Sequence, residues 1–186
     1  MTHASWLQRG KITEIVGPLG SGRTSLLLTA LREVTAGGGA VALVDADATF
    51  DPACAARAGA VLARLLWVRC GGRRDAAVAA LDLLARCSGF VLVVLDAGET
   101  PPRLSLAQAF RLRQAARRAD VALVLVGRHR VAGAGAALVV RTRREGLAWA
   151  GPRRHPTRLV GMRTALQVLR KQGAPSAPAE RRWWTA

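Results

Sequence analysis

Gly17-Pro18-Leu19-Gly20-Ser21-Gly22-Arg23-Thr24 is the stretch that decides the fold of this 186-residue chain. It follows a short apolar run, Lys11–Val16, and opens a helical pattern, Thr24–Ala36, in which leucines recur on one face. Its spacing matches G-x-x-x-x-G-K-[ST], a loop whose backbone N–H groups wrap a phosphate, except that arginine stands at the lysine position. We therefore expect a phosphate-binding loop formed by Gly17, Gly20, Ser21, Gly22, Arg23 and Thr24.

Beyond this loop, apolar runs of strand length alternate with helical patterns. The further strands are expected at Val41–Asp45, Leu65–Arg69, Phe90–Asp96 and Val121–Gly127. The helices between them are expected at Pro52–Ala58, Ala76–Arg86 and Leu104–Arg118. This order predicts an α/β fold with a doubly wound, mostly parallel sheet.

The pattern changes after Gly127, where antiparallel strands are expected. Ala136–Thr142 and Leu147–Ala150 are expected to form a hairpin that turns at Glu145-Gly146. Leu159–Lys171 fits both a helix and a strand, so both interpretations stay open.

The domain organisation expected is a single core domain over residues 1–172. Residues 173–186 would be a proline-containing linker and a tail rich in tryptophan and arginine. That tail is either the last edge strand of the core or a segment that binds a partner, because tryptophan and arginine are enriched at binding hot spots. The candidate partner-binding residues are Arg181, Arg182, Trp183 and Trp184.

The composition is strongly basic, with 28 Lys and Arg residues against 12 Asp and Glu residues and a net charge of +16. Such an excess favours a polyanionic partner such as nucleic acid, an acidic protein surface or anionic lipid. The alternative is that a GC-rich genome spreads arginine evenly over the surface, since only Lys11 and Lys171 are lysines.

No apolar run is long enough to span a bilayer and no secretory signal pattern is present, so we expect a cytoplasmic protein without a membrane partner. The three cysteines lie far apart, which argues against a disulfide framework or a zinc site.

Three stretches make a family resemblance specific. Gly10–Pro18, Val44–Pro52 and Cys87–Asp96 resemble the core of the RecA recombinases. The resemblance implies that Arg23 and Thr24 stand at the Walker A lysine and threonine, and that Asp96 is the Walker B carboxylate. Thr24 and Asp96 would then hold Mg²⁺ with ATP. Asp47 stands at the family's catalytic glutamate, one methylene shorter, and Cys54 stands at the tyrosine that stacks on adenine.

The sequence also departs from the RecA pattern at several places. The glutamine that senses the γ-phosphate is replaced by Arg128-His129-Arg130, and the two DNA-gripping loops shrink to Ala97–Arg103 and Arg128–Gly135. With nine residues before Gly10, the helix and strand that link RecA protomers are expected to be absent. Arginine is not a conservative replacement for the Walker lysine. Two interpretations of ATP with Mg²⁺ therefore stay open: weak binding survives, or the loop is only structural.

Small RecA-like chains of this kind resemble ImuA, an accessory protein of SOS mutagenesis. The resemblance implies an adaptor in translesion DNA synthesis whose partners are an ImuB-like Y-family polymerase homologue and an error-prone polymerase, with RecA and non-specific DNA as further candidates. It would work in the bacterial cytoplasm, at the nucleoid when DNA is damaged. The candidate DNA contacts are Arg111, Arg113, Arg117, Arg118, Arg128, His129 and Arg130. The alternatives are an ATP-hydrolysing P-loop regulator of DNA repair and a SulA-like inhibitor of cell division.

A few other residues carry specific expectations. Asp45 and Asp47 share one face of an extended segment, so they could form a carboxylate pair, although capping of the next turn is favoured. Trp67 and Trp149 stand in apolar strand patterns and are expected in the core. Trp6 is expected to cover an edge of the sheet.

Overall fold

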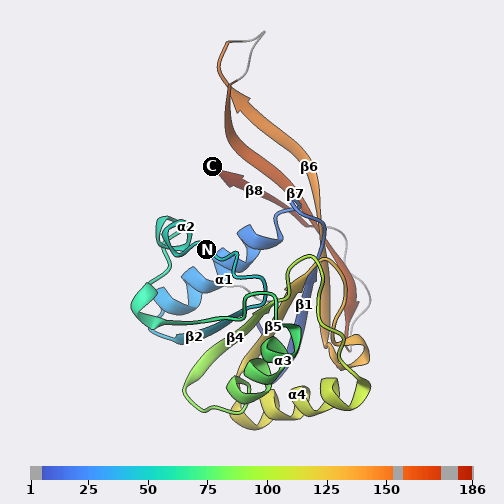
Figure 1. The fold of residues 1–186 in the computed structure, drawn as a ribbon. Helices are drawn as coiled ribbons and strands as arrows, with labels where there is room; N and C mark the ends of the chain where they lie inside the picture. The colour runs from blue at the N-terminus through green and yellow to red at the C-terminus, as the bar shows by residue number, and fades with distance from the viewer. Residues whose placement is uncertain (1–5, 153–156, 173–179, 186) are drawn as a thin grey trace.

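The computed structural model describes residues 6–152, 157–172 and 180–185, with the side chains of 180–183 and 185 left out. Their backbone forms one eight-stranded sheet with the strand order β3-β2-β4-β5-β1-β6-β7-β8 (Figure 1). The strands are β1 (Ile12–Val16), β2 (Ala40–Asp45), β3 (Leu65–Arg69), β4 (Phe90–Asp96), β5 (Ala122–Gly127), β6 (Leu138–Ala150), β7 (Arg158–Lys171) and β8 (Glu180–Thr185). The pairs from β3 through β1 to β6 are parallel, whereas β6–β7 and β7–β8 are antiparallel. The predicted α/β fold, mostly parallel with C-terminal antiparallel strands, is confirmed.

Helices cover both faces of the sheet (Figure 1). The helices are α1 (Arg23–Ala36), α2 (Pro52–Arg57), α3 (Arg74–Leu84) and α4 (Leu106–Ala119), with short 3-10 turns η1 (Leu62–Arg64) and η2 (Gly133–Gly135). Leucines of α1 pack with Ile15, Leu43 and Val94 on one face of the sheet. Leucines of α3 and α4 pack with other alternating strand residues, such as Val93 and Leu123, on the opposite face. The fold is therefore doubly wound, and its central strands are apolar on both faces.

The parallel connections place one set of loops at a single edge of the sheet. β1, β2, β4 and β5 all run in the same direction, so the residues after their carboxyl ends meet there. Open α/β sheets bind ligands outside this edge. The loop at Gly17, the loop at Asp47, the residues after Asp96 and the loop at Arg128 are the segments that follow these four strands.

The expected hairpin at Glu145-Gly146 is wrong. β6 continues from Leu138 to Ala150, and β7 pairs with it along its whole length. The pairing shifts between Arg144 and Gly146, so Glu145 forms a bulge instead of a turn. A bulge takes up one extra residue without ending the strand. Leu159–Lys171, which fitted a helix and a strand, lies within strand β7.

The backbone of residues 180–185 forms β8, the edge strand beside β7. Residues 173–179, the stretch that contains the expected linker, lie outside the described residues. In the described part of the chain, no helix is both long enough and apolar enough to cross a membrane.

The tryptophans divide into two groups. Trp6, which was expected at an edge of the sheet, is 8% exposed and packs in the core cluster on the α1 side instead. The half-buried Trp67 packs against the same cluster, as expected. Trp149 was expected in the core, but it is 51% exposed. The reason is that the outer half of β6 and β7 extends beyond the helices, so no helix of the described residues covers it (Figure 1).

Candidate phosphate-binding site

The loop from Gly17 to Thr24 joins β1 to α1 and is held closely against the antiparallel strands. Gly22 has a φ of 93°, a left-handed conformation that favours glycine. A Cβ at Gly22 would lie 2.3 Å from Oγ1 of Thr164, and a Cβ at Gly17 would lie 2.3 Å from Oγ1 of Thr142. Both glycines are therefore required by close contact with β6 and β7, independently of any ligand.

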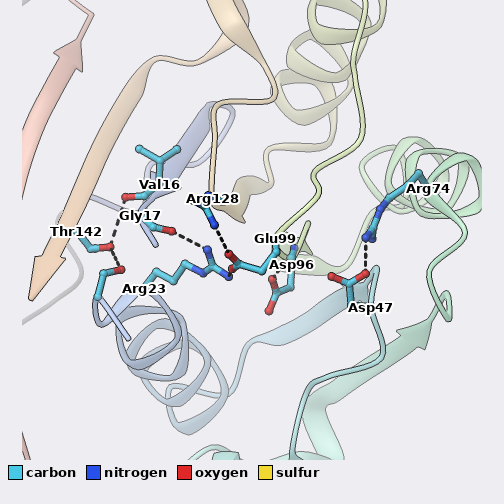
Figure 2. A network of polar contacts seen from close by, with 11 residues as sticks. Val16, Gly17, Arg23, Asp47, Arg74, Asp96, Glu99, Arg128 and Thr142 are labelled. Carbon is cyan, nitrogen blue, oxygen red and sulfur yellow. Dashed lines mark hydrogen bonds and ion pairs between the residues drawn. The ribbon is translucent and has the colours of Figure 1, made fainter. Parts of the chain in front are cut away.

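Two buried threonines hydrogen-bond this loop. The hydroxyl groups of Thr142 and Ser21 lie 2.7 Å apart, and the Thr142 hydroxyl lies 3.4 Å from the carbonyl oxygen of Val16 (Figure 2). The Thr164 hydroxyl donates to the carbonyl oxygen of Ser21 at 3.1 Å and accepts from the indole N–H of Trp184 at 3.0 Å. A chain of hydrogen bonds thus connects the edge strand β8 to the phosphate-binding loop.

Arg23, at the Walker lysine position, is 5% exposed and contacts two protein oxygens. Its guanidinium donates to the carbonyl oxygen of Gly17 at 2.6 Å and forms an ion pair with Glu99, from the segment after β4 (Figure 2). The other carboxylate oxygen of Glu99 lies 3.4 Å from the guanidinium of Arg128. Guanidinium groups match carboxylates and phosphates alike, so Glu99 makes the kind of contact that a phosphate would make with this side chain.

Asp47, at the position of the catalytic glutamate, is also paired. Its carboxylate lies 2.5 Å from the guanidinium of Arg74 at the start of α3. A Cβ at Gly98 would lie 1.7 Å from Oδ2 of Asp47, so this carboxylate packs directly on the backbone of Gly98. A general base needs a free carboxylate within reach of its substrate, and here that carboxylate neutralises an arginine.

Asp45 and Asp47 do not form a carboxylate pair. Asp45 is completely buried, and its oxygens accept the backbone N–H groups of Thr49 and Phe50 at 3.2 and 2.9 Å. They also accept the indole N–H of Trp67 at 3.2 Å. Asp45 therefore caps the turn after β2, which is the role that was favoured for it.

Asp96 ends β4 and faces this group of charges. Burial raises the pKa of its carboxyl above the usual range, and the negative charges of Asp45 and Asp47 raise it further. The Gly98 N–H, which donates to Asp96 at 3.2 Å, and the charge of Arg23 lower the pKa but do not cancel the rise. The carboxyl at the Walker B position is thus harder to ionise than an ordinary aspartate.

The residues expected to bind Mg-ATP fit it only in part. Thr24 is exposed at the start of α1, and no hydrogen bond joins it to Asp96 in the described structure. Across residues 6–152, 157–172 and 180–185, no group of three or more His, Cys, Asp or Glu side chains is arranged to hold a metal ion. The arginines that would neutralise a triphosphate, Arg23 and Arg128, are both paired with the carboxylate of Glu99. Cys54, half-buried on α2, offers no ring to stack on adenine. The residues present therefore do not form a complete site for ATP with Mg²⁺.

The candidate DNA contacts fall into two groups. The first group consists of four exposed side chains on α4: Arg111, Arg113, Arg117 and Arg118. Of these, Arg111 lies 3.4 Å from Asp82. Arg113 stacks on Phe110, with 5.1 Å between the guanidinium carbon and the ring centre. In the loop after β5, Arg128 faces Glu99, Arg130 lies 3.2 Å from Glu14, and His129 is exposed. The α4 group faces outward, whereas the loop arginines are held by carboxylates.

Sequence reasoning missed Glu14. Its side chain is 1% exposed and accepts the backbone N–H groups of Val131 and Ala132 at 2.5 and 2.7 Å, besides its contact with Arg130. A glutamate in an otherwise apolar strand was a signal that could have found it. Glu99 and Arg74 carried no such signal, because their partners are distant in sequence.

The candidate partner-binding residues of the tail lie in β8. The side chains of Arg181, Arg182 and Trp183 lie outside the described residues. Trp184 is half-buried and packs beside the α1 side of the core, where it donates to Thr164. Its role toward a partner remains a prediction.

Comparison with known proteins agrees with this geometry. The model of the RecA N-terminal domain matches residues 4–107. The RecA protein of Chlorobaculum tepidum is 39% identical over 90 residues, which is 48% of this chain and 26% of that relative. The RecA protein of Thermus aquaticus is 37% identical over 90 residues, again 48% of this chain and 26% of the relative. This chain therefore spans about a quarter of the length of these relatives. With the strand–loop–helix at Gly17 and the aspartate that ends β4, the chain belongs to the RecA N-terminal domain family.

Proposed function

We propose that this chain is an accessory protein of DNA damage tolerance that uses a RecA core as a scaffold and does not hydrolyse ATP. It links DNA or RecA to an error-prone translesion polymerase complex, in the manner of ImuA. Its partners are an ImuB-like Y-family polymerase homologue and an error-prone polymerase, and it works in the cytoplasm at damaged DNA.

The pairing of Arg23 with Glu99 carries this proposal. In a nucleotide-hydrolysing loop the Walker cation must be available to the phosphates, but Arg23 is buried and neutralised by a carboxylate of its own chain. The Asp47–Arg74 pair supports the same conclusion at the catalytic position. Each pair removes a different requirement of hydrolysis: neutralisation of phosphate charge and activation of water.

The positive charge of α4 supports the link to DNA. Arg111, Arg113, Arg117 and Arg118 are all exposed on this helix, so they are accessible to phosphates. Binding through such contacts is independent of sequence and weakens steeply with salt, because each neutralised phosphate releases counterions.

Two measurements test the proposal. After DNA damage, the tagged full-length chain is purified from cells, and we expect the Y-family homologue and the error-prone polymerase to co-purify with it. Phosphate release from Mg-ATP by the same preparation is expected to stay at background. Steady ATP turnover would favour a P-loop regulator instead, and capture of a cell-division GTPase without DNA binding would favour a SulA-like inhibitor.

A gel-shift experiment tests the DNA contact. At about 50 mM salt, where phosphate contacts are strong, the chain should retard duplex and single-stranded DNA without sequence preference. The double variant Arg117→Ala, Arg118→Ala should reduce both the affinity and its salt dependence. Absence of any shift would remove DNA from the partners.

A further inference from the structure

Arginines gather on one face of the β6–β7 hairpin. Val139 packs in the core cluster of α3 and α4, and alternate residues of a strand share a face, so Arg141 and Arg143 lie on this side of the sheet. Thr164 contacts the phosphate-binding loop on the α1 side, so its neighbour Arg163 lies on the same side as Arg143. The strand pairing adds two more arginines, so the arginine face consists of Arg141, Arg143, Arg158, Arg163 and Arg170.

Small residues of β6 separate the outer arginines of this face. Gly146 pairs with Arg163. Ala150 pairs with Arg158, and Ala148 stands between the two pairs on the same face. A Cβ at Gly146 would lie 3.7 Å from Nη2 of Arg163, so this guanidinium lies over the glycine. No large side chain of outer β6 therefore keeps a rigid partner away from the guanidinium groups.

Little negative charge accompanies the arginine face. All five arginines are exposed, and no helix of the described residues covers the outer half of the hairpin (Figure 1). The acidic residue of β6 and β7 is Glu145, whose side chain is 18% exposed and lies 3.8 Å from Arg143. Within the part of the chain that the structure describes, no carboxylate forms an ion pair with the other four arginines. The arginine face therefore keeps a net positive charge.

The arginine face continues to the loop after β5. Arg170 donates to the carbonyl oxygen of Gly133 at 3.3 Å, and Arg130 donates to the same oxygen at 2.6 Å. Glu14 neutralises Arg130, whereas Arg170 pairs with no carboxylate of the described residues. Because like charges repel, an anion bound beside Arg170 would stabilise this arrangement.

We propose that the arginine face binds nucleic acid through the phosphates of its backbone. Guanidinium groups bind phosphate oxygens through paired hydrogen bonds. A protein partner would need aromatic or aliphatic anchors at the centre of the interface, but Leu147, Trp149 and Leu159 lie on the opposite face of the hairpin. Protein–DNA interfaces are more polar and more positively charged than protein–protein interfaces, and the arginine face has this character.

This inference rests on the proposed function, since it names a surface, separate from the arginines of α4, through which the adaptor would hold DNA. The probe is a fluorescein-labelled DNA duplex of about 20 base pairs, titrated with the full chain at salt concentrations from about 50 to 200 mM. Fluorescence anisotropy gives the binding constant at each salt concentration. The slope of log K against log[salt] then reports how many phosphates the chain neutralises.

The double variant Arg143→Gln, Arg163→Gln removes two of the proposed phosphate contacts. Each contact on duplex DNA contributes about −0.9 to the slope, so the slope should become shallower by about 1.8. Binding at about 100 mM salt should weaken roughly 10- to 100-fold. Arg143→Lys, Arg163→Lys keeps both charges and should keep most of the slope. Because both positions are exposed, the melting temperatures of these variants should stay close to that of the wild type.

The matched control is the double variant Arg32→Gln, Arg64→Gln. It removes the same charge from exposed positions on α1 and η1, and α1 covers the opposite face of the sheet. Its slope should stay close to that of the wild type. Equal losses in the two glutamine variants would show that net charge alone attracts DNA, which overturns the inference. An unchanged slope in Arg143→Gln, Arg163→Gln, no binding of the duplex by the wild type, or tighter binding of polyglutamate than of the duplex also overturns it.

The same variants separate this inference from the proposed function. If the duplex binds through Arg143 and Arg163 but no polymerase subunit co-purifies with the wild type after DNA damage, the arginine face stands and the proposed function falls. If the polymerase complex co-purifies, and DNA binding is weakened by Arg117→Ala, Arg118→Ala but not by Arg143→Gln, Arg163→Gln, the proposed function stands and the inference is overturned.

Discussion

Arg23 and Glu99 form an ion pair across the phosphate-binding loop, and the same guanidinium donates to the carbonyl oxygen of Gly17. The side chain of Arg23 is 6% exposed, whereas that of Glu99 is 33% exposed. Glu99 is therefore the partner that solvent and ligands can reach. A planar guanidinium binds a carboxylate through two parallel hydrogen bonds more readily than a lysine does. A phosphate that enters this loop must compete with a carboxylate already tethered beside it.

This relationship predicts that Mg-ATP stabilises the wild-type chain little. A ligand present at 100 times its dissociation constant adds about 2.7 kcal/mol to the free energy of unfolding. At millimolar Mg-ATP we expect no clear rise in the melting temperature. Glu99→Gln removes the competing charge and should produce a measurable rise with the same ligand.

The control for this experiment is Thr24→Ala. Thr24 is the hydroxyl expected to meet Mg²⁺, so its removal should leave the wild-type result unchanged. A clear thermal shift of the wild type that Thr24→Ala abolishes would falsify the view that the nucleotide site is relaxed.

Replacement of Arg23 by lysine should not restore hydrolysis. In Arg23→Lys the cation becomes more compact, but Asp47 remains paired with Arg74, and Arg128 remains beside Glu99. We expect phosphate release to remain at background in a steady-state assay. Turnover well above that of the wild type would show that the arginine alone had disabled the site.

The buried carboxyl of Asp96 predicts a specific pH dependence. Burial raises its pKa in the folded chain above the value of about 3.9 found in unfolded chains. The stability contributed by the protonated form is fully present below the unfolded pKa and is lost as pH rises through the folded pKa. At neutral pH the charge is a net cost, so Asp96→Asn should raise the free energy of unfolding at pH 7, and the gain should shrink as pH falls toward 4.

Urea unfolding at both pH values measures this difference. Asp120→Asn, at an exposed position that pairs with Arg9, is the matched control and should show no comparable gain at pH 7. If Asp96→Asn is less stable than the wild type at neutral pH, the favourable contact with Arg23 outweighs burial.

Glu14 is expected to be the strongest single anchor of the loop after β5. Glu14→Ala leaves the N–H groups of Val131 and Ala132 without their acceptor and removes the carboxylate that pairs with Arg130. We expect a loss of about 2–4 kcal/mol in urea unfolding. Glu14→Gln keeps a carbonyl acceptor and should lose less. Equal, small losses in both variants would contradict the anchoring role.

Trp184 should contribute to stability through β8. A fully buried aromatic side chain costs about 3–5 kcal/mol on truncation to alanine, and Trp184 is half-buried, so we expect about 2–3 kcal/mol for Trp184→Ala. Trp184→Phe keeps most of the packing but removes the donor to Thr164, and its loss should be smaller. A wild-type melting temperature in Trp184→Ala would show that β8 does not support the fold.

The sequence predicted the parallel part of the fold because its signals are local. Phe90–Asp96 and Leu65–Arg69 have the predicted bounds, since continuous apolar runs between polar segments mark buried parallel strands. The glycine spacing placed the loop between β1 and α1 for the same reason. The antiparallel part was harder, because Glu145-Gly146 resembles a turn and only the pairing with β7 makes it a bulge.

The sequence alone determined which residues stand where the resemblance to RecA places chemistry: Arg23 for the lysine, Asp47 for the glutamate, and Arg128-His129-Arg130 for the glutamine. Only the tertiary structure decided what these residues do, because their partners come from other elements. Glu99 reaches Arg23, Arg74 reaches Asp47, and Thr142 and Thr164 reach the loop from strands more than a hundred residues away. Exposure was decided in the same way: Trp149 has an apolar strand pattern like that of a core residue, but it is 51% exposed. An apolar pattern indicates that a side chain is suited to burial. Burial itself requires that another helix or strand packs against that side chain.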